Sequence, residues 1–349
     1  MSEYLTVAGL GAVLALTLTL PFSVKKVEEE LEAFLFLMGA AAATVSGTWS
    51  YALLGEALRE PVGIALAALV LGFAFRAARP RFRAWLAALT KKLGLRRALF
   101  SVIILLGLGA SVITAIIAAL ALAEIISILR LERRREIRLV VYACYAIGLG
   151  AALTPIGEPL GTIAVAKLKG PPHNADFFYL LERIGAWVVP GVLFTAWWGT
   201  RGIGDSAAAG TGLAEDVRET GRSVFMRAAK IYVFVMALIL LGAGLSPLAE
   251  RLVPGMPVWA LFWANSLSAV LDNATLAAAE LVPLMTDKQV KFTLMGLLIS
   301  GGMLIPGNIP NIISASKLNI RSREWARAAL PYGAFLMAAY FILMTVFVE

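Results

Sequence analysis

The sequence predicts an all-α polytopic membrane protein built from inverted-topology repeats. The chain of 349 residues is 60% hydrophobic and only 15% charged, and its mean hydropathy is +0.81. Soluble domains have about 45–50% apolar and about 25% charged residues. Several apolar runs are long enough to span a bilayer. A soluble globular, disordered or disulfide-stabilised protein is therefore excluded.

The net charge of +8 has two interpretations. In a soluble protein it would suggest a nucleic-acid partner. In a membrane protein, Lys and Arg gather in cytoplasmic loops and fix the topology, so we expect a lipid bilayer and no nucleic acid. The single cysteine, Cys144, excludes an intramolecular disulfide, and the single histidine, His173, excludes a paired-histidine cofactor site. No cofactor is expected.

The N-terminal segment, residues 1–60, is predicted to contribute two scaffold spans. These are the apolar runs Leu5–Phe22 and Ala33–Leu54. A third span, Val62–Ala78, begins the next unit. The stretch Arg81–Lys92 has apolar residues at helical spacing among basic ones, which predicts an amphipathic helix on the membrane surface.

Two apolar runs predict re-entrant helical hairpins. The run 98–129 is long for one span and short for two, and it has small and polar residues, including Ser111 and Thr114, in its middle. A single long tilted helix is the alternative. The run 257–286 is interrupted at Asp272-Asn-Ala-Thr275, which predicts the second hairpin tip there.

Two further runs predict discontinuous transmembrane helices. The run 139–168 is interrupted at Thr154-Pro-Ile-Gly-Glu-Pro-Leu-Gly161, and the run 290–318 at Pro306-Gly-Asn-Ile-Pro-Asn311. Pro and Gly free backbone carbonyls and amides, which membrane proteins tolerate only where protein or water covers them. The interruptions are therefore expected to be buried around a site.

The two halves resemble each other in the order and spacing of these motifs. Gly157-Glu158 and Gly307-Asn308 are 150 residues apart, as are Lys167 and Lys317. If each hairpin returns to its own side, 24 of the 31 basic residues fall on one side, which is then cytoplasmic. The halves then enter the membrane from opposite sides, so they form an inverted repeat. Both termini are predicted to be extracytoplasmic.

This gives a complete domain prediction. The chain is divided into a two-span segment at 1–60, a first inverted repeat at 61–200, a cytoplasmic connector at 201–227 and a second inverted repeat at 228–349.

Asp272 and Glu158 carry the functional prediction. Each lies deep in an apolar segment, and an intramembrane carboxylate is a functional hypothesis by default. Together with polar neighbours they would form an oxygen site for a small cation such as Na⁺, and both acids would be sodium ligands and proton carriers. The predicted ion-binding residues are Asp272, Asn273, Thr275, Glu158, Thr154, Asn308, Asn311, Ser111 and Thr114.

Other charged residues are given structural roles. Glu124 and Glu280 lie nearer the surface and are expected to snorkel or to pair with basic residues near Arg130 and Lys288. Lys167 and Lys317 end the discontinuous helices and are expected to anchor them at the membrane interface.

Three motifs resemble those of the ion transporter superfamily. Thr154-Pro-Ile-Gly-Glu-Pro159 and Leu271-Asp-Asn-Ala-Thr-Leu276 are similar to motifs of NhaD-type sodium/proton antiporters, a group related to the ArsB arsenite transporters. Gly301-Gly-Met-Leu-Ile-Pro-Gly-Asn308 resembles their second Gly-rich broken helix. The similarity is greater to an uncharacterised prokaryotic family described as cation transporters. It implies a multi-pass inner-membrane protein, a homodimer with a moving transport domain, and an ion site at these motifs.

The predicted function is therefore a secondary active transporter, a sodium (cation)/proton antiporter that works by alternating access. An anion symporter or oxyanion transporter, for arsenite or di- and tricarboxylates, is the first alternative. A non-transporting membrane scaffold is the second. The sequence shows no nucleophile–base pair, so an enzyme is not expected.

Overall fold

The chain is helical throughout the part that the structure describes. We analysed a computed structural model, which describes residues 3–24, 26–27, 30–129, 131–201, 203, 221–252 and 256–348. The fold is 83% helix, and the described residues contain no strand. Four described helical segments are long and apolar enough to cross a membrane: Leu95–Ile113, Tyr179–Thr200, Ala228–Leu248 and Ser322–Phe347. The predicted all-α membrane class is thus confirmed.

The N-terminal segment contains α1 (Glu3–Ser23) and α3 (Leu31–Ser46). The predicted second span, Ala33–Leu54, was drawn too long. Gly47 ends α3 in the left-handed conformation, with φ 72°, and its N–H caps the carbonyl groups of the last turn. Ser50 then begins the next helix by accepting a hydrogen bond from the Leu53 N–H at 3.0 Å.

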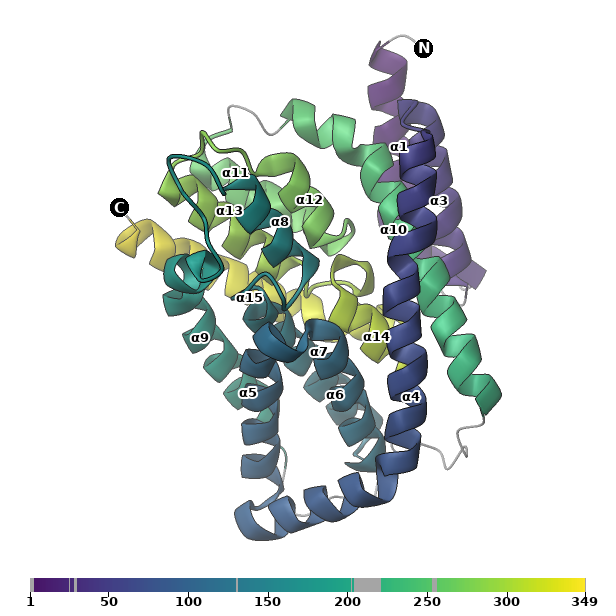
Figure 1. The fold of residues 1–349 in the computed structure, drawn as a ribbon, viewed down its shortest axis with the longest axis vertical. Coiled ribbons are helices and arrows are strands. Elements are labelled where there is room, and N and C mark those ends of the chain that lie inside the picture. Colours follow the sequence, from purple (N-terminus) through teal and green to yellow (C-terminus); the bar gives the residue numbers. More distant parts are fainter. Residues whose placement is uncertain are drawn as a thin grey trace.

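That next helix, α4 (Tyr51–Leu93), is longer than the sequence predicted. A span and a separate surface helix were expected, but both lie within this one helix of 43 residues. Figure 1 shows that α4 runs down the molecule and that its last part turns to cross the bottom before α5. The basic stretch therefore forms the corner of the fold.

The first half continues with two helices in place of the run 98–129. They are α5 (Leu95–Ile113) and α6 (Ala115–Leu129), which pack side by side and are joined at Thr114, whose φ is 77°. The alternative of one long helix is therefore wrong. The run 139–168 is likewise divided into α7 (Arg133–Ala151) and the short α8 (Pro159–Lys167).

The second half has the same order of elements. The remaining elements are α9 (Tyr179–Thr200), α10 (Gly221–Leu252), α11 (Val258–Ala264), the 3₁₀ turn η1 (Asn265–Ala269), α12 (Asn273–Glu280), α13 (Asp287–Ser300), the 3₁₀ turn η2 (Ile305–Gly307), α14 (Ile309–Leu318) and α15 (Ser322–Phe347). The predicted interruptions at 272–275 and 306–311 thus coincide with a helix start and with η2.

Helices α7 and α13 form the centre of the molecule. Every residue of α7 from Leu139 to Ala151 is buried, and so is every residue of α13 from Phe292 to Ser300. Both runs are apolar or small on all sides, as expected for a helix surrounded by others. The two discontinuous helices therefore place their interruptions inside the protein.

Packing is reciprocal between the halves. In the first half α7 packs against α5 and α9, and in the second α13 packs against α11 and α15. Other contacts run between the two halves: α6 of the first half contacts α14 of the second, and α12 of the second contacts α8 of the first (Figure 1). Helices α4 and α10 in turn contact α6 and α12. Each half thereby supplies part of the surroundings of the other half's interruption.

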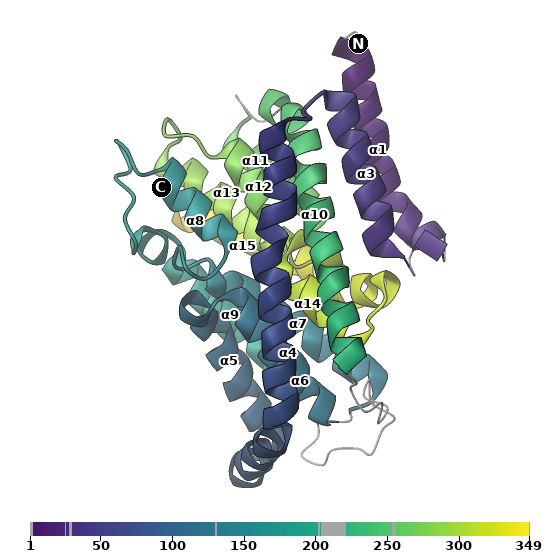
Figure 2. The same cartoon turned by 45° about the vertical axis from the view of Figure 1, so that its right-hand side comes forward.

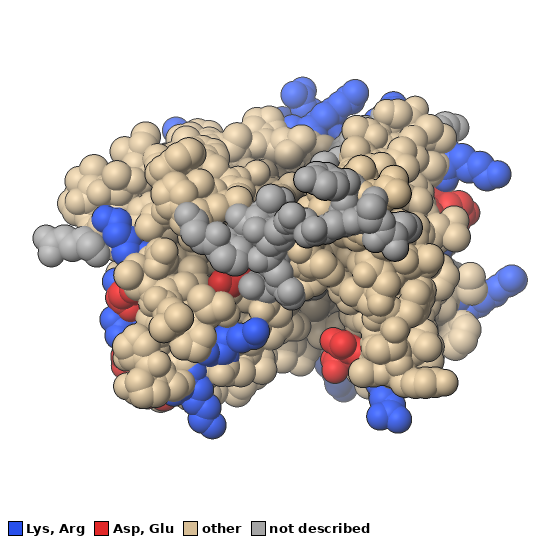
Figure 3. Space-filling model, turned by 90° about the horizontal axis from the view of Figure 1, so that it is seen from above, with Lys and Arg blue, Asp and Glu red and all other residues tan. Residues whose placement is uncertain are grey.

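Helices α1 and α3 lie at one side of the molecule, beside α10, as Figure 2 shows. Both marked chain ends lie in the upper half of Figure 1, away from the corner between α4 and α5. On the upper face, most of the Lys and Arg side chains that are drawn lie towards the rim of a largely uncharged surface (Figure 3).

Candidate functional site

The starts of α8 and α14 have the same local structure. Glu158 is the N-cap of α8, with φ −155° and ψ 161°, and Asn308 is the N-cap of α14, with φ −157° and ψ 148°. Proline follows in the first turn of each helix, where its missing N–H costs nothing. The two caps, 150 residues apart, are therefore structural counterparts.

These two caps also contact each other. The Asn308 side-chain amide donates a hydrogen bond to Glu158 Oε2 at 3.4 Å. Both residues are buried, and Glu158 Oε1 has no hydrogen-bond partner. None of the described Lys or Arg residues forms an ion pair with Glu158. The site thus holds a buried carboxylate with an unsatisfied oxygen and no basic partner.

The start of α12 lies beside this carboxylate. Asp272 is close enough to Glu158 for the two carboxylates to repel each other, and Asn273 is a further neighbour of Glu158. Asn273 begins α12, is 2% exposed, and its side-chain nitrogen has no hydrogen-bond partner. Four predicted ion-binding residues, Glu158, Asp272, Asn273 and Asn308, are therefore brought together.

The junction between α5 and α6 is connected to the interruption between α7 and α8 by hydrogen bonds. The Thr154 hydroxyl donates to the Ser111 carbonyl, and the Ala115 N–H, at the start of α6, donates to the Gly157 carbonyl at 2.8 Å. The Ser111 hydroxyl donates to the Leu108 carbonyl at 2.7 Å. The Thr154 hydroxyl and the Ser111 carbonyl thus connect the interruption between α7 and α8 to the end of α5.

Thr114 and Asn311 have similar supporting roles. The Thr114 hydroxyl accepts a long hydrogen bond, 3.4 Å, from the Ile117 N–H. The Asn311 amide donates to the Gly301 and Leu304 carbonyls at 2.8 and 2.9 Å, so it satisfies backbone groups that the interruption frees. Asn311 Oδ1 remains without a partner. The Thr275 side chain lies outside the described part of the structure.

A glycine that sequence reasoning missed supports the site. A Cβ at Gly148, on α7, would lie 2.8 Å from the Asn308 amide nitrogen. A side chain at this position would force the Asn308 amide, which contacts Glu158, to move. The only sequence signal was the pair of glycines, Gly148 and Gly150, near the end of an apolar helix.

The electrostatics of the site favour a cation. Helix N-termini carry partial positive charge, and those of α8 and α12 already have Glu158 and Asp272 as neighbouring carboxylates. Within the described residues, no group of three or more His, Cys, Asp and Glu side chains is placed to hold a metal ion. Such a site offers two carboxylates with neutral amides.

Lys317 and Glu124 differ from their expected roles. Lys317 was expected at the membrane interface, and Glu124 beside the basic residues near Arg130. Instead Lys317 Nζ lies 2.8 Å from Glu124 Oε2, and the two side chains are 3% and 2% exposed. This buried ion pair joins α14 to α6. The two residues are separated by 193 positions, so no local pattern reveals the contact.

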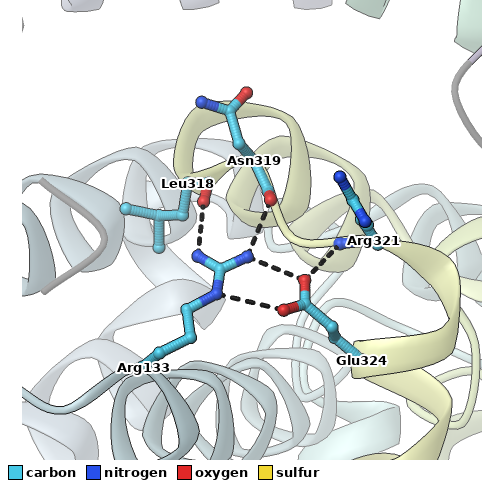
Figure 4. Close-up of polar contacts among 5 residues, drawn as sticks. All are labelled: Arg133, Leu318, Asn319, Arg321 and Glu324. Carbon is cyan, nitrogen blue, oxygen red and sulfur yellow. Dashed lines mark hydrogen bonds and ion pairs between the residues drawn. The ribbon is translucent and has the colours of Figure 1, made fainter. Parts of the chain in front are cut away.

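Arg133, the first residue of α7, contacts the C-terminal end of α14 (Figure 4). Its guanidinium donates to the carbonyls of Leu318 and Asn319 at 3.3 and 2.9 Å and forms a two-bond ion pair with Glu324. Asn319 ends α14 in the left-handed conformation, with φ 48°. Helices α7, α14 and α15 are thus locked together.

This structure is that of an all-helical membrane protein with two interrupted helices meeting at buried polar residues. Residues 7–347 match the model of the family described as "Protein of unknown function (DUF1646)". Since the match covers nearly the whole chain, the protein belongs to that family. No curated protein matches the sequence.

Proposed function

We propose that the protein is a secondary active transporter, a sodium (cation)/proton antiporter that works by alternating access. The observation that carries the proposal is Glu158, a buried carboxylate with one unsatisfied oxygen, beside Asp272 and two side-chain amides. A buried charge without a partner is very unfavourable, so this group needs a cation or a proton. Competition between the two at the same oxygens is sufficient for exchange.

The reciprocal packing supports an inverted repeat with two re-entrant hairpins. In transporters of this kind, discontinuous helices meet at a central site, and alternating access is a movement of one unit against the other. Here α6 contacts α14 and α12 contacts α8, so each proposed hairpin closes on the interrupted helix of the other half. A homodimeric scaffold in a prokaryotic inner membrane, with both termini outside, belongs to the same proposal.

The exchange would proceed through two loaded states. With Na⁺ bound, the cation would be held by the Glu158 and Asp272 carboxylates and adjacent amide oxygens. After the site turns to the other side, protons would replace Na⁺ on the same carboxylates. Either cargo neutralises the buried charge, whereas the empty charged site is costly to move through the membrane.

Anion transport is a weaker proposal. It would need free helix N-termini or an available lysine, but carboxylates occupy the starts of α8 and α12 and Lys317 pairs with Glu124. Uptake of labelled citrate, succinate or arsenite by the wild type and by Asp272→Asn alike would favour it. The absence of any effect of ions on thermal stability would favour a non-transporting scaffold.

The decisive experiment measures proton movement driven by a Na⁺ gradient in proteoliposomes with an internal pH-sensitive dye. The wild type should exchange the ions, whereas Glu158→Gln and Asp272→Asn should not. Glu182→Gln, an equivalent change at an exposed glutamate on α9, is the matched control and should remain active. Unchanged exchange in both site variants would contradict the proposal.

Proton competition gives a second measurement on the same proteins. Na⁺ should raise the thermal stability of the wild type, and the increase should shrink as the pH falls because protons displace the ion. Asp272→Asn should abolish the dependence that arises at this site. K⁺ at the same concentration controls for ionic strength.

A further inference from the structure

A second group of unsatisfied oxygens lies away from the Glu158 site. It consists of Asn265 at the start of η1, Thr293 in the middle of α13 and Glu280 at the end of α12. Asn265 and Thr293 are completely buried, and Glu280 is 5% exposed. Glu280 was expected to reach the surface or a basic partner near Lys288, but it is turned into the protein.

Asn265 connects the other two residues, through the main chain of Thr293 and the side chain of Glu280. Its amide nitrogen donates to the Thr293 carbonyl at 3.1 Å, and its side chain interacts with the Glu280 carboxyl. One oxygen of each side chain has no hydrogen-bond partner: Glu280 Oε2, Asn265 Oδ1 and Thr293 Oγ1. Three unpartnered oxygens on buried residues that are connected in this way are unusual, because buried polar atoms are normally satisfied.

Helix α6, the counterpart of α12 in the first half of the chain, also contains a buried glutamate, and that glutamate is neutralised by a lysine. Glu124, on α6, receives the Lys317 ammonium group at the end of α14. The counterpart of Lys317 is Lys167 at the end of α8, which is exposed. None of the described Lys and Arg residues forms an ion pair with Glu280. Here the fold supplies a buried carboxylate without the ammonium group.

We infer that Glu280, Asn265 and Thr293 form a second site for a monovalent cation of the Na⁺ class. One carboxylate balances one positive charge, and carboxylate, amide and hydroxyl oxygens are hard ligands that suit a small cation. A cation can take more than one of these oxygens as ligands, whereas a proton on Glu280 can be donated to only one acceptor. The inference shares no residue with the Glu158 site and stands without the proposed function.

The site joins η1, α12 and α13, because Asn265, Glu280 and Thr293 each belong to a different one of these elements. A cation bound there would hold the end of α12 against α13, and α12 begins at Asn273 beside Glu158. Occupancy of the second site would therefore stabilise the second hairpin in the arrangement seen here.

The test is equilibrium binding of radiolabelled Na⁺ to the purified full-length protein at constant pH. The wild type should bind Na⁺ at this site, and Glu280→Gln should lose that ion while its remaining Na⁺ binding is unchanged. Thr293→Val keeps the side-chain shape and removes one ligand, so it should weaken the same site about tenfold or more. Glu182→Gln is the control and should bind as the wild type does.

Two outcomes would overturn the inference. One is wild-type Na⁺ binding in both Glu280→Gln and Thr293→Val. The other is stability that responds to pH at Glu280 but not to Na⁺, which would assign a protonated carboxyl to this position. The Asp272→Asn variant distinguishes the two sites. It should still bind the Na⁺ ion that Glu280→Gln loses. If Asp272→Asn does not reduce Na⁺ binding at all, that result contradicts the Glu158 site and not the second site.

Discussion

Asn308 donates a hydrogen bond to Glu158 across the meeting point of the two interrupted helices, 3.4 Å from amide nitrogen to carboxylate oxygen. Each residue is the N-cap of its short helix, and their backbone angles are nearly equal. Equivalent positions of the two halves thus carry an acid in one half and an amide in the other. The two N-caps therefore contribute one carboxylate, that of Glu158. Asp272, directly before α12, adds a second carboxylate near it.

The first prediction concerns Asn308→Ala. Loss of the amide removes a hydrogen bond to a charged oxygen, an interaction of about 1.5–3 kcal/mol. The Na⁺ affinity should therefore fall by about tenfold or more, measured as the Na⁺ concentration that gives half the thermal shift. Ser101→Ala, an exposed position on α5, provides the control. An unaltered half-saturation value would remove Asn308 from the site.

The second prediction concerns the buried pair of Glu124 and Lys317. Removing either charge alone leaves the other buried, which should lower the free energy of unfolding by about 3–5 kcal/mol. Glu124→Gln combined with Lys317→Met should recover much of this loss. Thermal unfolding of the four proteins in detergent forms a double-mutant cycle. Additive effects of the single changes would show that the pair is not coupled.

The sequence predicted the elements of the site but not its contacts. Pro and Gly at 155–161 and 306–310 indicate helix interruptions, because backbone geometry depends on local residue type. Glu158 and Asn308 were both predicted to line the ion site, but the hydrogen bond between them was not predicted. The pairing of Lys317 with Glu124 depends on the packing of α14 against α6, which no local pattern encodes.

Local hydrogen bonding explains the other differences. Thr154 is predicted to be an ion ligand because it is a hydroxyl at an interruption, and in the structure its hydroxyl donates a hydrogen bond to the Ser111 carbonyl. A hydroxyl beside a broken helix serves the backbone as readily as an ion, and the sequence does not separate the two roles. The early end of α3 was readable from Gly47 and Ser50, a helix stop and a helix start within four residues.

The third prediction concerns topology. The one native cysteine, Cys144, is buried, so an introduced cysteine can be labelled against a low background. Asn174→Cys, before α9, should react with a membrane-impermeant maleimide in intact cells, whereas Lys92→Cys, at the end of α4, should react only after the membrane is opened. Both positions are exposed. The reverse pattern would place both termini in the cytoplasm.

The last prediction tests the close approach of α5 and α7. A Cβ at Gly150 would overlap the Gly107 carbonyl, whereas a Cβ at Gly109 would meet nothing within 4 Å. Gly150→Ala should therefore lower stability by about 1–3 kcal/mol through overpacking. Gly109→Ala should raise it by up to about 1 kcal/mol, since alanine is the better helix former. Thermal unfolding measures the stability of both variants. The same change, glycine to alanine, is then compared on α7 and on α5, two helices in contact. Gly148 of α7 lies against Asn308, so displacement of α7 by Gly150→Ala should also weaken Na⁺ binding. If the Gly150→Ala variant is destabilised but binds Na⁺ with wild-type affinity, the site does not depend on this packing.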